Sequence, residues 1–323
     1  MVASHAISRM GMRLFSPIFL SDFLLRSFQR PYEKLISAQN RDENDVITHY
    51  TVSKNSGWLM VVPKETSKPE GCIVPFTFAN GTGWVGYFLM NAAYRGRGWG
   101  RALFHALLAN YVASGTTIVG LDGVDEQKRT YERRGFIATG LIRLMTRPSL
   151  KETHLEKVEI KLASGEKLVD LREIPHKALV ESDLAHSGFA RPALWSDEAL
   201  FHRSDLYGYA IVSSTDSSEL LGWIMVRRCQ HGHRFGPLYA DSYDQASVLL
   251  RVAMEKIDTS DGSMVTEVFP NNPKGVQVFE ELGWQWGGVD YHRMWLGGRV
   301  PREQQEGGRG EKGMYAIFDA SEG

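Results

Sequence analysis

The stretch from Trp84 to Leu108 constrains the fold more than any other part of the sequence. An apolar, aromatic-rich run of strand type ends at Asn91, and glycines alternate with arginines in the short loop that follows. From Ala102 the apolar residues recur with a helical period. A strand, a glycine-rich turn and a helix N-terminus together form an anion site, because the first helical amides lack intrahelical partners and the helix dipole is positive there. The stretch therefore predicts a phosphate-binding loop.

The spacing of this loop excludes two common phosphate-binding motifs. A dinucleotide fingerprint, Gly-x-Gly-x-x-Gly, fails because counting from Gly96 places Arg101 at the third glycine. A P-loop needs Gly-Lys-Ser or Gly-Lys-Thr at its end, and the loop has neither. A plain glycine-rich strand-to-helix turn is the structural alternative.

The remaining pattern, Arg95-x-x-Gly98-x-Gly100, resembles the pyrophosphate-binding signature of the GNAT acetyltransferase superfamily. The resemblance implies acetyl-CoA as co-substrate, with its pyrophosphate in the loop. It also implies that amides near Leu89 and Met90 face the acetyl thioester. The implied pyrophosphate-binding residues are Arg95, Gly96, Arg97, Gly98, Trp99, Gly100 and Arg101.

The same resemblance implies catalytic residues downstream of the loop. Tyr131 stands four residues before Gly135-Phe136, where family members often place the tyrosine that protonates the departing thiolate. Asp122, at the end of a predicted strand, is the candidate base, and Glu126 one turn further on is a candidate for the acceptor site. The structural alternatives are a packed aromatic for Tyr131 and capping or solvated carboxylates for the two acids.

Length and composition fit a globular chain of two domains. The chain has 323 residues, a formal net charge of -1 and two cysteines, Cys72 and Cys229, far apart in sequence. These features argue against a protein built to coat nucleic acid or a membrane, and we expect a cytoplasmic protein. The segment from Cys229 to His233 lacks the second ligand pair of a structural zinc site, so we expect a hairpin turn there and no metal.

The second half of the chain repeats the first in weakened form. The hexamer from Tyr131 to Phe136 has a counterpart from Phe279 to Trp284, which lacks the tyrosine, and the second half has no Arg-x-x-Gly-x-Gly loop. Its sequence resembles the C-terminal domain of YitH-like tandem GNAT proteins. Arg191 is a candidate for the groove that faces the first half.

These patterns predict an α/β (α+β) fold of two tandem GNAT-type domains, each a mixed, splayed β-sheet flanked by helices. The expected boundaries are 46–150 for the domain that binds acetyl-CoA and 157–323 for a degenerate copy, with a mobile loop over 299–313. A strand is expected from Val46 to Val52. Residues 1–45 are expected to be helical, with an arginine-rich mitochondrial targeting peptide as the alternative.

The implied activity is direct acetyl transfer from acetyl-CoA to a primary amine of a small molecule or peptide. No cysteine lies near the loop, which favours attack within a ternary complex over a covalent acetyl-enzyme. The alternative from another class is a non-catalytic acyl-CoA-binding or scaffold protein of the same fold.

Overall fold

The computed structural model describes residues 12–15, 43–53, 57–64, 68–153, 155–156, 158–257 and 262–323. Most of the N-terminal segment 1–45, including the targeting alternative, lies outside these residues. The first half of the chain contains β1 Met12–Phe15, α3 Glu43–Ser53, β2 Leu59–Pro63, β3 Gly71–Thr77, β4 Thr82–Met90, η2 Ala92–Tyr94, α4 Trp99–Ala113, β5 Ile118–Val124, α5 Asp125–Glu132 and β6 Phe136–Arg147.

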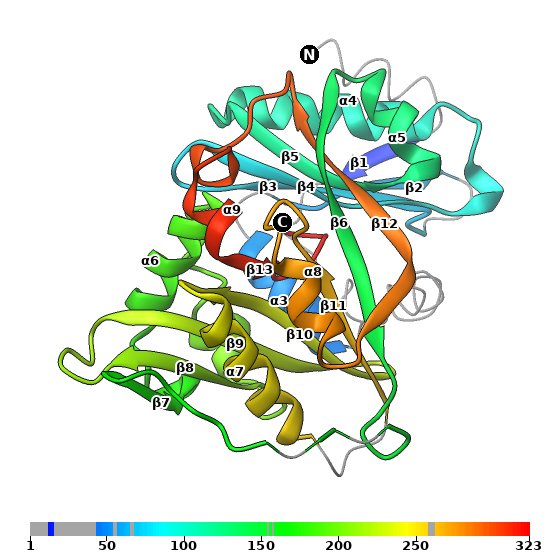
Figure 1. The fold of residues 1–323 in the computed structure, drawn as a ribbon. Coiled ribbons are helices and arrows are strands. Elements are labelled where there is room, and N and C mark those ends of the chain that lie inside the picture. Colours follow the sequence, from blue (N-terminus) through cyan, green and yellow to red (C-terminus); the bar gives the residue numbers. More distant parts are fainter. Residues whose placement is uncertain are drawn as a thin grey trace.

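The second half repeats the order of strands and helices (Figure 1). It contains β7 Glu166–Asp170, η3 Leu171–Glu173, α6 His176–Ser187, the π-helix η4 Asp197–Phe201, β8 Tyr207–Ser213, β9 Leu220–Cys229, β10 Gly232–Ala240, α7 Tyr243–Glu255, β11 Ser263–Val268, α8 Gly275–Glu280, β12 Gln285–Leu296, η5 Arg302–Gln304, α9 Arg309–Gly313 and β13 Met314–Ala316. The predicted α/β architecture of two tandem domains is therefore confirmed.

All described strands join one mixed sheet, and the two halves exchange strands within it. The order is β1-β2-β3-β4-β5-β12-β6-β11-β13-β10-β9-β8-β7. β12 of the second half thus lies between β5 and β6 of the first, while β6 lies between β12 and β11. Figure 1 shows β6 and β12 crossing from the upper to the lower half as two long neighbouring strands. Each half is completed by a strand from the other.

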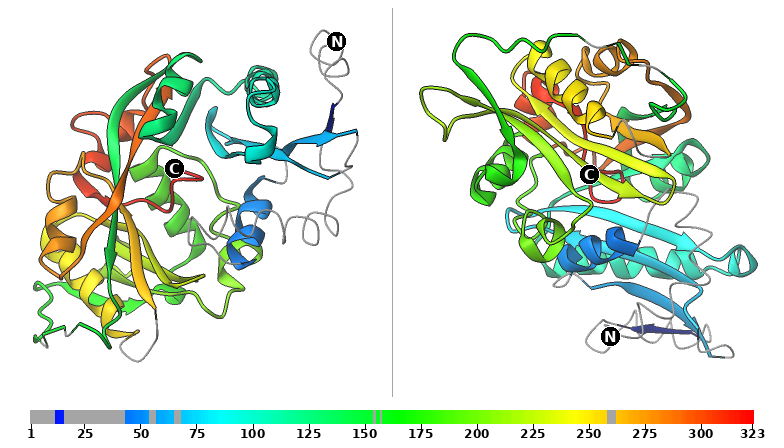
Figure 2. Two further views of the ribbon diagram at one scale, coloured as in Figure 1. Left: turned by 90° about the vertical axis from the view of Figure 1, so that its right-hand side faces the viewer. Right: turned by 90° about the horizontal axis from the view of Figure 1, so that it is seen from below.

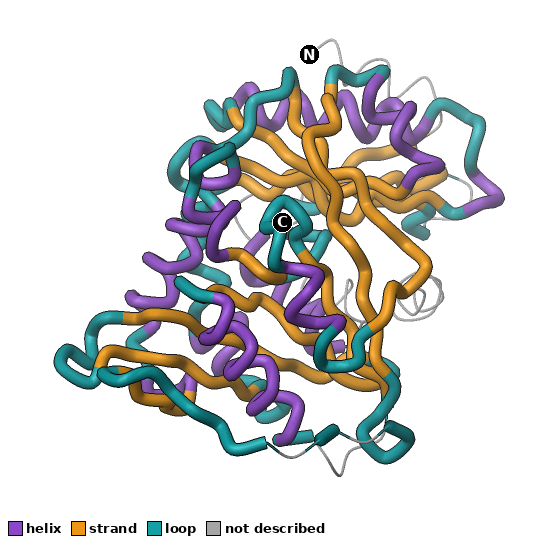
Figure 3. The backbone as a smooth tube through the Cα atoms, in the orientation of Figure 1, coloured by secondary structure: helices purple, strands orange, loops and turns teal. Residues whose placement is uncertain are grey.

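Helices cover both faces of the sheet because alternate strand residues point to opposite faces. In β3, Ile73 packs with the apolar face of α4, whereas Cys72 and Val74 belong to a second cluster on the other face. The second half follows the same rule. In β9, Ile224 packs with the α7 side, and Trp223 packs with α6 and η4. The tube in Figure 3 and the two turned views in Figure 2 show these helical layers on either side of the strands.

The segment from Val46 to Val52 is helical, so the predicted strand is wrong. Its β-branched residues favour a strand locally, but the buried side chains described in α3 are polar, and Asp45, Thr48 and His49 among them follow a helical spacing. Their partners come from distant parts of the chain. Asp45 accepts from Arg203, and His49 pairs with Glu322 at 2.7 Å. Tertiary pairing therefore overrides the local preference.

The segment 299–313, predicted as a mobile loop, contains short helices, and its mobility stays a prediction. This segment contains η5 and α9, and α9 packs against α6. Gln304 is 4% exposed, accepts from the Arg293 guanidinium at 3.0 Å and donates to the Ser187 carbonyl at 2.7 Å. These long-range contacts hold a stretch whose glycine-rich and charged composition is typical of loops.

Candidate active site

The splay between β4 and β5 creates the site. The two strands pair in parallel only from Thr82 to Trp84, whereas β5 continues to Val124 paired on its other edge with β12. β4 carries a bulge after the last of these pairs, where two residues, Tyr87 and Phe88, stand opposite one on β3. Tyr87 has φ +50°, a left-handed conformation that is uncommon for an aromatic residue. The bulge turns the end of β4 away from β5 and opens a cavity.

The loop after β4 presents free backbone donors to that cavity. Gly98 is the N-cap of α4 at φ +81°, and no side chain caps the helix. A side chain at this left-handed position would be strained, so glycine suits it. The first amides of α4 therefore remain available to an anion at the positive end of the helix dipole.

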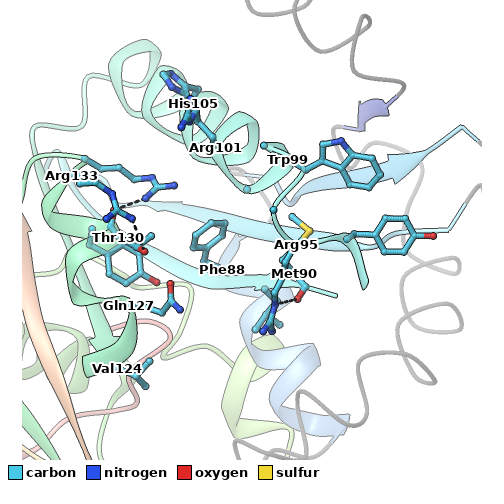
Figure 4. Close-up of a pocket in the computed structure, with 17 residues that line it drawn as sticks. Phe88, Met90, Arg95, Trp99, Arg101, His105, Val124, Gln127, Thr130 and Arg133 are labelled. Carbon is cyan, nitrogen blue, oxygen red and sulfur yellow. Dashed lines mark hydrogen bonds between the residues drawn. The ribbon is translucent and has the colours of Figure 1, made fainter. Parts of the chain in front are cut away.

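A cavity of about 1030 Å³ extends from this loop to α5. Its lining includes nine of the predicted site residues: Leu89, Met90, Arg95, Gly96, Gly98, Trp99, Gly100, Arg101 and Tyr131. Figure 4 shows Arg101 and His105 projecting from α4, Gln127, Thr130 and Arg133 from α5, and Phe88 between the two helices. We call this space the cofactor cavity. Its free amides, glycines and basic side chains fit a pyrophosphate-bearing group such as acetyl-CoA.

Arg97 does not line the cofactor cavity. Its guanidinium lies 4.9 Å from the centre of the Tyr94 ring and donates to the Ala93 carbonyl at 3.2 Å. Tyr94 in turn stacks on Trp99 with ring centres 5.2 Å apart. Arg97 therefore packs against the loop from outside the cavity, and its predicted part in binding the cofactor stays a prediction.

Tyr131 lies where the cofactor cavity meets a second cavity of about 300 Å³. Its ring packs on Phe88, Phe104 and Phe136. Gly123 of β5 leaves room for it, since a Cβ there would lie 2.7 Å from the Tyr131 ring. Burial raises the pKa of the phenol to about 12, while nearby Arg134 lowers it. Tyr131 therefore keeps its proton at neutral pH.

The second cavity, which we call the acceptor cavity, is lined by both halves of the chain. Five residues line both cavities: Phe88, Leu89, Val124, Gln127 and Tyr131. The second half contributes polar and apolar groups that the sequence did not indicate: Arg234, Val265, Glu267, Tyr291, Ala320 and Ser321. Gln127 was also missed, although it stands one helical turn before Tyr131 on the same face of α5.

Asp122 lines the acceptor cavity as half of a buried ion pair. Its carboxylate accepts from Arg293 Nε at 2.9 Å and from Arg293 Nη2 at 2.6 Å, and both side chains are almost wholly buried. The two residues are direct neighbours on β5 and β12. Burial raises the pKa of Asp122 to about 6, against the lowering effect of Arg293, and the carboxylates of Glu267 and Asp319 add to the rise.

Two residues predicted for the acceptor site, Glu126 and Arg191, line neither cavity. Glu126 is exposed on α5 and lines neither cavity. Arg191 is buried and gives a two-pronged ion pair to Asp183 at 2.8 and 2.9 Å, and it also donates to the Glu322 and Gly323 carbonyls. Asp183 accepts further bonds from Trp195 and Tyr239. Arg191 is therefore a structural residue of the second half.

The second half lacks the features of the cofactor site. The N-terminus of α7 is closed by a capping box, in which Ser242 and Gln245 bond each other's backbone amides. Phe279, at the position of Tyr131, is fully buried in the core. The first amides of α4 have no side-chain partner, whereas at the N-terminus of α7 side chains satisfy some of the corresponding amides. As expected, Cys229 and His233 flank a hairpin turn between β9 and β10.

The fold and the site define an acyltransferase of the GNAT class. A model described as the acetyltransferase (GNAT) family matches residues 20–136, and one described as an acetyltransferase (GNAT) domain matches residues 179–307. The chain therefore belongs to the GNAT superfamily and carries two GNAT domains in tandem.

Individual relatives agree with this assignment. A curated holothin acyltransferase from Pseudoalteromonas sp. (strain SANK 73390) is 24% identical over 219 residues, which is 68% of each chain. The crystal structure of a putative acetyltransferase from Pyrococcus horikoshii has a TM-score of 0.69 at 19% identity, covering 97% of this chain and 96% of its own. A tandem GNAT protein from the clavulanic acid biosynthesis pathway has a TM-score of 0.61 at 14% identity, covering 88% and 97%. The narrower likeness to the YitH-like type stays a prediction.

In the described part of the chain, no helix is both long and apolar enough to cross a membrane.

Proposed function

We propose that the protein transfers an acetyl group from acetyl-CoA to the primary amine of a small molecule. The observation that carries this proposal is the meeting of two cavities at Tyr131, one built around a free helix N-terminus and the other reaching into the second half. Direct transfer needs two substrates side by side with a proton donor at their junction. A relative that is named a holothin acyltransferase also supports acyl transfer.

The proposed roles follow the positions of the residues. The loop amides after Gly98 bind the pyrophosphate, and amides at the end of β4, near Leu89 and Met90, stabilise the negative charge that develops on the thioester oxygen. The amine nitrogen forms a bond to the acetyl carbon, and the carbon–sulfur bond breaks. Asp122 takes the proton that the amine loses, and Tyr131 gives its proton to the departing sulfur.

The buried cysteines support direct transfer. Cys72 lies in β3 beneath the bulge and its Sγ donates to the Tyr87 carbonyl at 3.3 Å. Burial raises the pKa of this thiol to about 12, and burial also raises that of Cys229. Thiols that stay protonated are poor nucleophiles, so neither cysteine is suited to form an acetyl-enzyme.

A two-part experiment tests the proposal. Acetyl-CoA binding is measured by isothermal titration calorimetry, and the purified protein is then screened for CoA release with panels of arylalkylamines, polyamines, amino acids and peptides. We expect binding together with turnover of at least one small amine. Binding without turnover of any amine would favour the scaffold alternative, and turnover of peptides alone would overturn the small-molecule acceptor.

A further inference from the structure

A group of basic side chains forms one wall of the cofactor cavity. Arg101 and His105 lie one turn apart on α4, and Arg133 and Arg134 stand at the end of α5. Figure 4 shows Arg101 and His105 projecting from α4 and Arg133 coming from the end of α5 at the left of the view. The two helices therefore bring positive charge to one cavity from two sides.

Two of these arginines are held in place by uncharged groups. The Arg134 guanidinium lies 4.7 Å from the centre of the Phe104 ring and donates to the Thr130 carbonyl. Arg133 donates to the Thr130 hydroxyl at 3.4 Å. Both side chains are thus oriented by α5 and its neighbours, while their charges remain uncompensated.

Among the described residues, Arg101, Arg133 and Arg134 form no ion pair with a carboxylate. Burial lowers the pKa of Arg134, and the like charges of Arg133 and Arg101 lower it further. Several fully buried arginines elsewhere have acidic partners: Arg191 pairs with Asp183, Arg227 with Asp319 and Arg293 with Asp122. Like charges gathered without a counter-charge repel one another, and an anion between them would remove that cost.

This wall is distinct from the loop that offers backbone amides. The arginines of the loop bond back to it, since Arg95 Nε donates to the Met90 carbonyl at 3.1 Å and Arg97 donates to Ala93. CoA carries two separate anionic groups, the pyrophosphate and a phosphate monoester on the 3′ position of its ribose. A cavity that offers two separate anion-binding surfaces matches such a ligand.

We propose that Arg101, Arg133 and Arg134 bind the ribose 3′-phosphate and make the protein select CoA over dephospho-CoA. This inference rests on the proposed function, because it assigns a second phosphate subsite to the same co-substrate. The selection is electrostatic and geometric, since guanidinium groups bind phosphate oxygens in a planar, two-pronged manner.

The test compares CoA with dephospho-CoA, which lacks the 3′-phosphate. Dissociation constants are measured by isothermal titration calorimetry for the wild type, Arg133→Ala, Arg101→Ala and the control Arg129→Ala. Arg129 is exposed on α5 and does not line the cavity. We expect the wild type to prefer CoA by about tenfold or more, because charge-assisted contacts to phosphate are the stronger hydrogen bonds.

The variants show which side chains cause the preference for CoA over dephospho-CoA. Arg133→Ala and Arg101→Ala should each weaken CoA binding about three- to tenfold and leave dephospho-CoA binding nearly unchanged. Arg129→Ala should match the wild type, and Arg133→Lys should retain most of the preference. Both Arg133 and Arg101 are exposed, so their replacement leaves the core intact.

Three results would overturn the inference. Equal affinity of the wild type for CoA and dephospho-CoA would show that no side chain binds the 3′-phosphate. The proposed acetyl transfer would not be affected by this result. Equal weakening of both ligands by the arginine variants would assign these side chains to the pyrophosphate. If the wild type binds neither ligand, the proposed function fails and the subsite fails with it.

Discussion

Replacing Tyr131 by phenylalanine isolates the single oxygen on which the proposed chemistry depends. The ring is held by Phe88, Phe104 and Phe136, with ring centres 6.2 to 6.4 Å away, and phenylalanine preserves these contacts. Among the described residues, the Tyr131 hydroxyl has no hydrogen-bond partner, so the substitution removes no structural bond. We therefore expect the free energy of unfolding to change by less than about 1 kcal/mol.

The effect on catalysis should be much larger. With a pKa of about 12, the phenol is fully protonated at neutral pH and available as a donor. General acid catalysis by a positioned side chain contributes about 10²–10⁴-fold, which is roughly 2.7–5.4 kcal/mol of activation free energy. We expect Tyr131→Phe to lose kcat by this factor and to keep the dissociation constant for acetyl-CoA within about twofold.

The assay follows CoA thiol release under saturating acetyl-CoA, with Tyr111→Phe as the matched control. Tyr111 is also buried, but its hydroxyl donates to the Trp84 carbonyl at 2.6 Å and lies away from both cavities. The control should lower the free energy of unfolding by about 1–3 kcal/mol because it removes a buried hydrogen bond, and it should leave kcat unchanged. Full kcat in Tyr131→Phe would refute the assignment of the acid.

Three further predictions follow from the same structure. Gly98→Glu should abolish acetyl-CoA binding in calorimetry, because a side chain is strained at φ +81° and its negative charge would occupy the anion site; unchanged affinity would refute the loop assignment. For an acceptor whose amine stays neutral, kcat/KM should rise with pH through about 6, the raised pKa of Asp122, since the base must be ionised to accept a proton. Asp122→Asn should remove this rise in the pH profile. A rise that persists in the variant would exclude Asp122 as the base. A fragment ending at residue 150 lacks β12, so β5 loses its neighbour on one edge and the core of the first half loses Met294 and Trp295. Thermal unfolding of this fragment, followed by circular dichroism, should therefore show no cooperative transition. A sharp transition would show that the first half folds alone.

Part of the site is local in sequence and was predictable for that reason. The end of β4, the glycine-rich loop and the first turn of α4 are contiguous, so their shared cavity follows from a strand, a turn and a helix in succession. Tyr131 lies on α5, the next helix along the chain, and lines the same cavity. Gln127 could have been found by the same helical spacing.

The rest of the site depends on partners that local patterns do not specify. Arg191 looked like a groove residue, yet its charge is taken up by Asp183 in the core. The β-branched residues of α3 predicted a strand, but burial of Asp45 and His49 against distant charges selects a helix. In both cases the deciding partner lies in another element, and in α3 it lies in the other half of the chain.

The sequence by itself determined the class of the protein, the loop from Arg95 to Arg101 and the presence of one intact and one degraded copy. These features depend on neighbours along the chain, whose spacing fixes which backbone groups and side chains can meet. The tertiary structure alone decided that β6 and β12 are exchanged, that Asp122 pairs with Arg293 across 171 residues, and that Glu267 and Arg234 line the acceptor cavity. Strand order and ion pairing at such separations are set by which arrangement buries both cores and satisfies the buried charges, and no short sequence pattern carries that information.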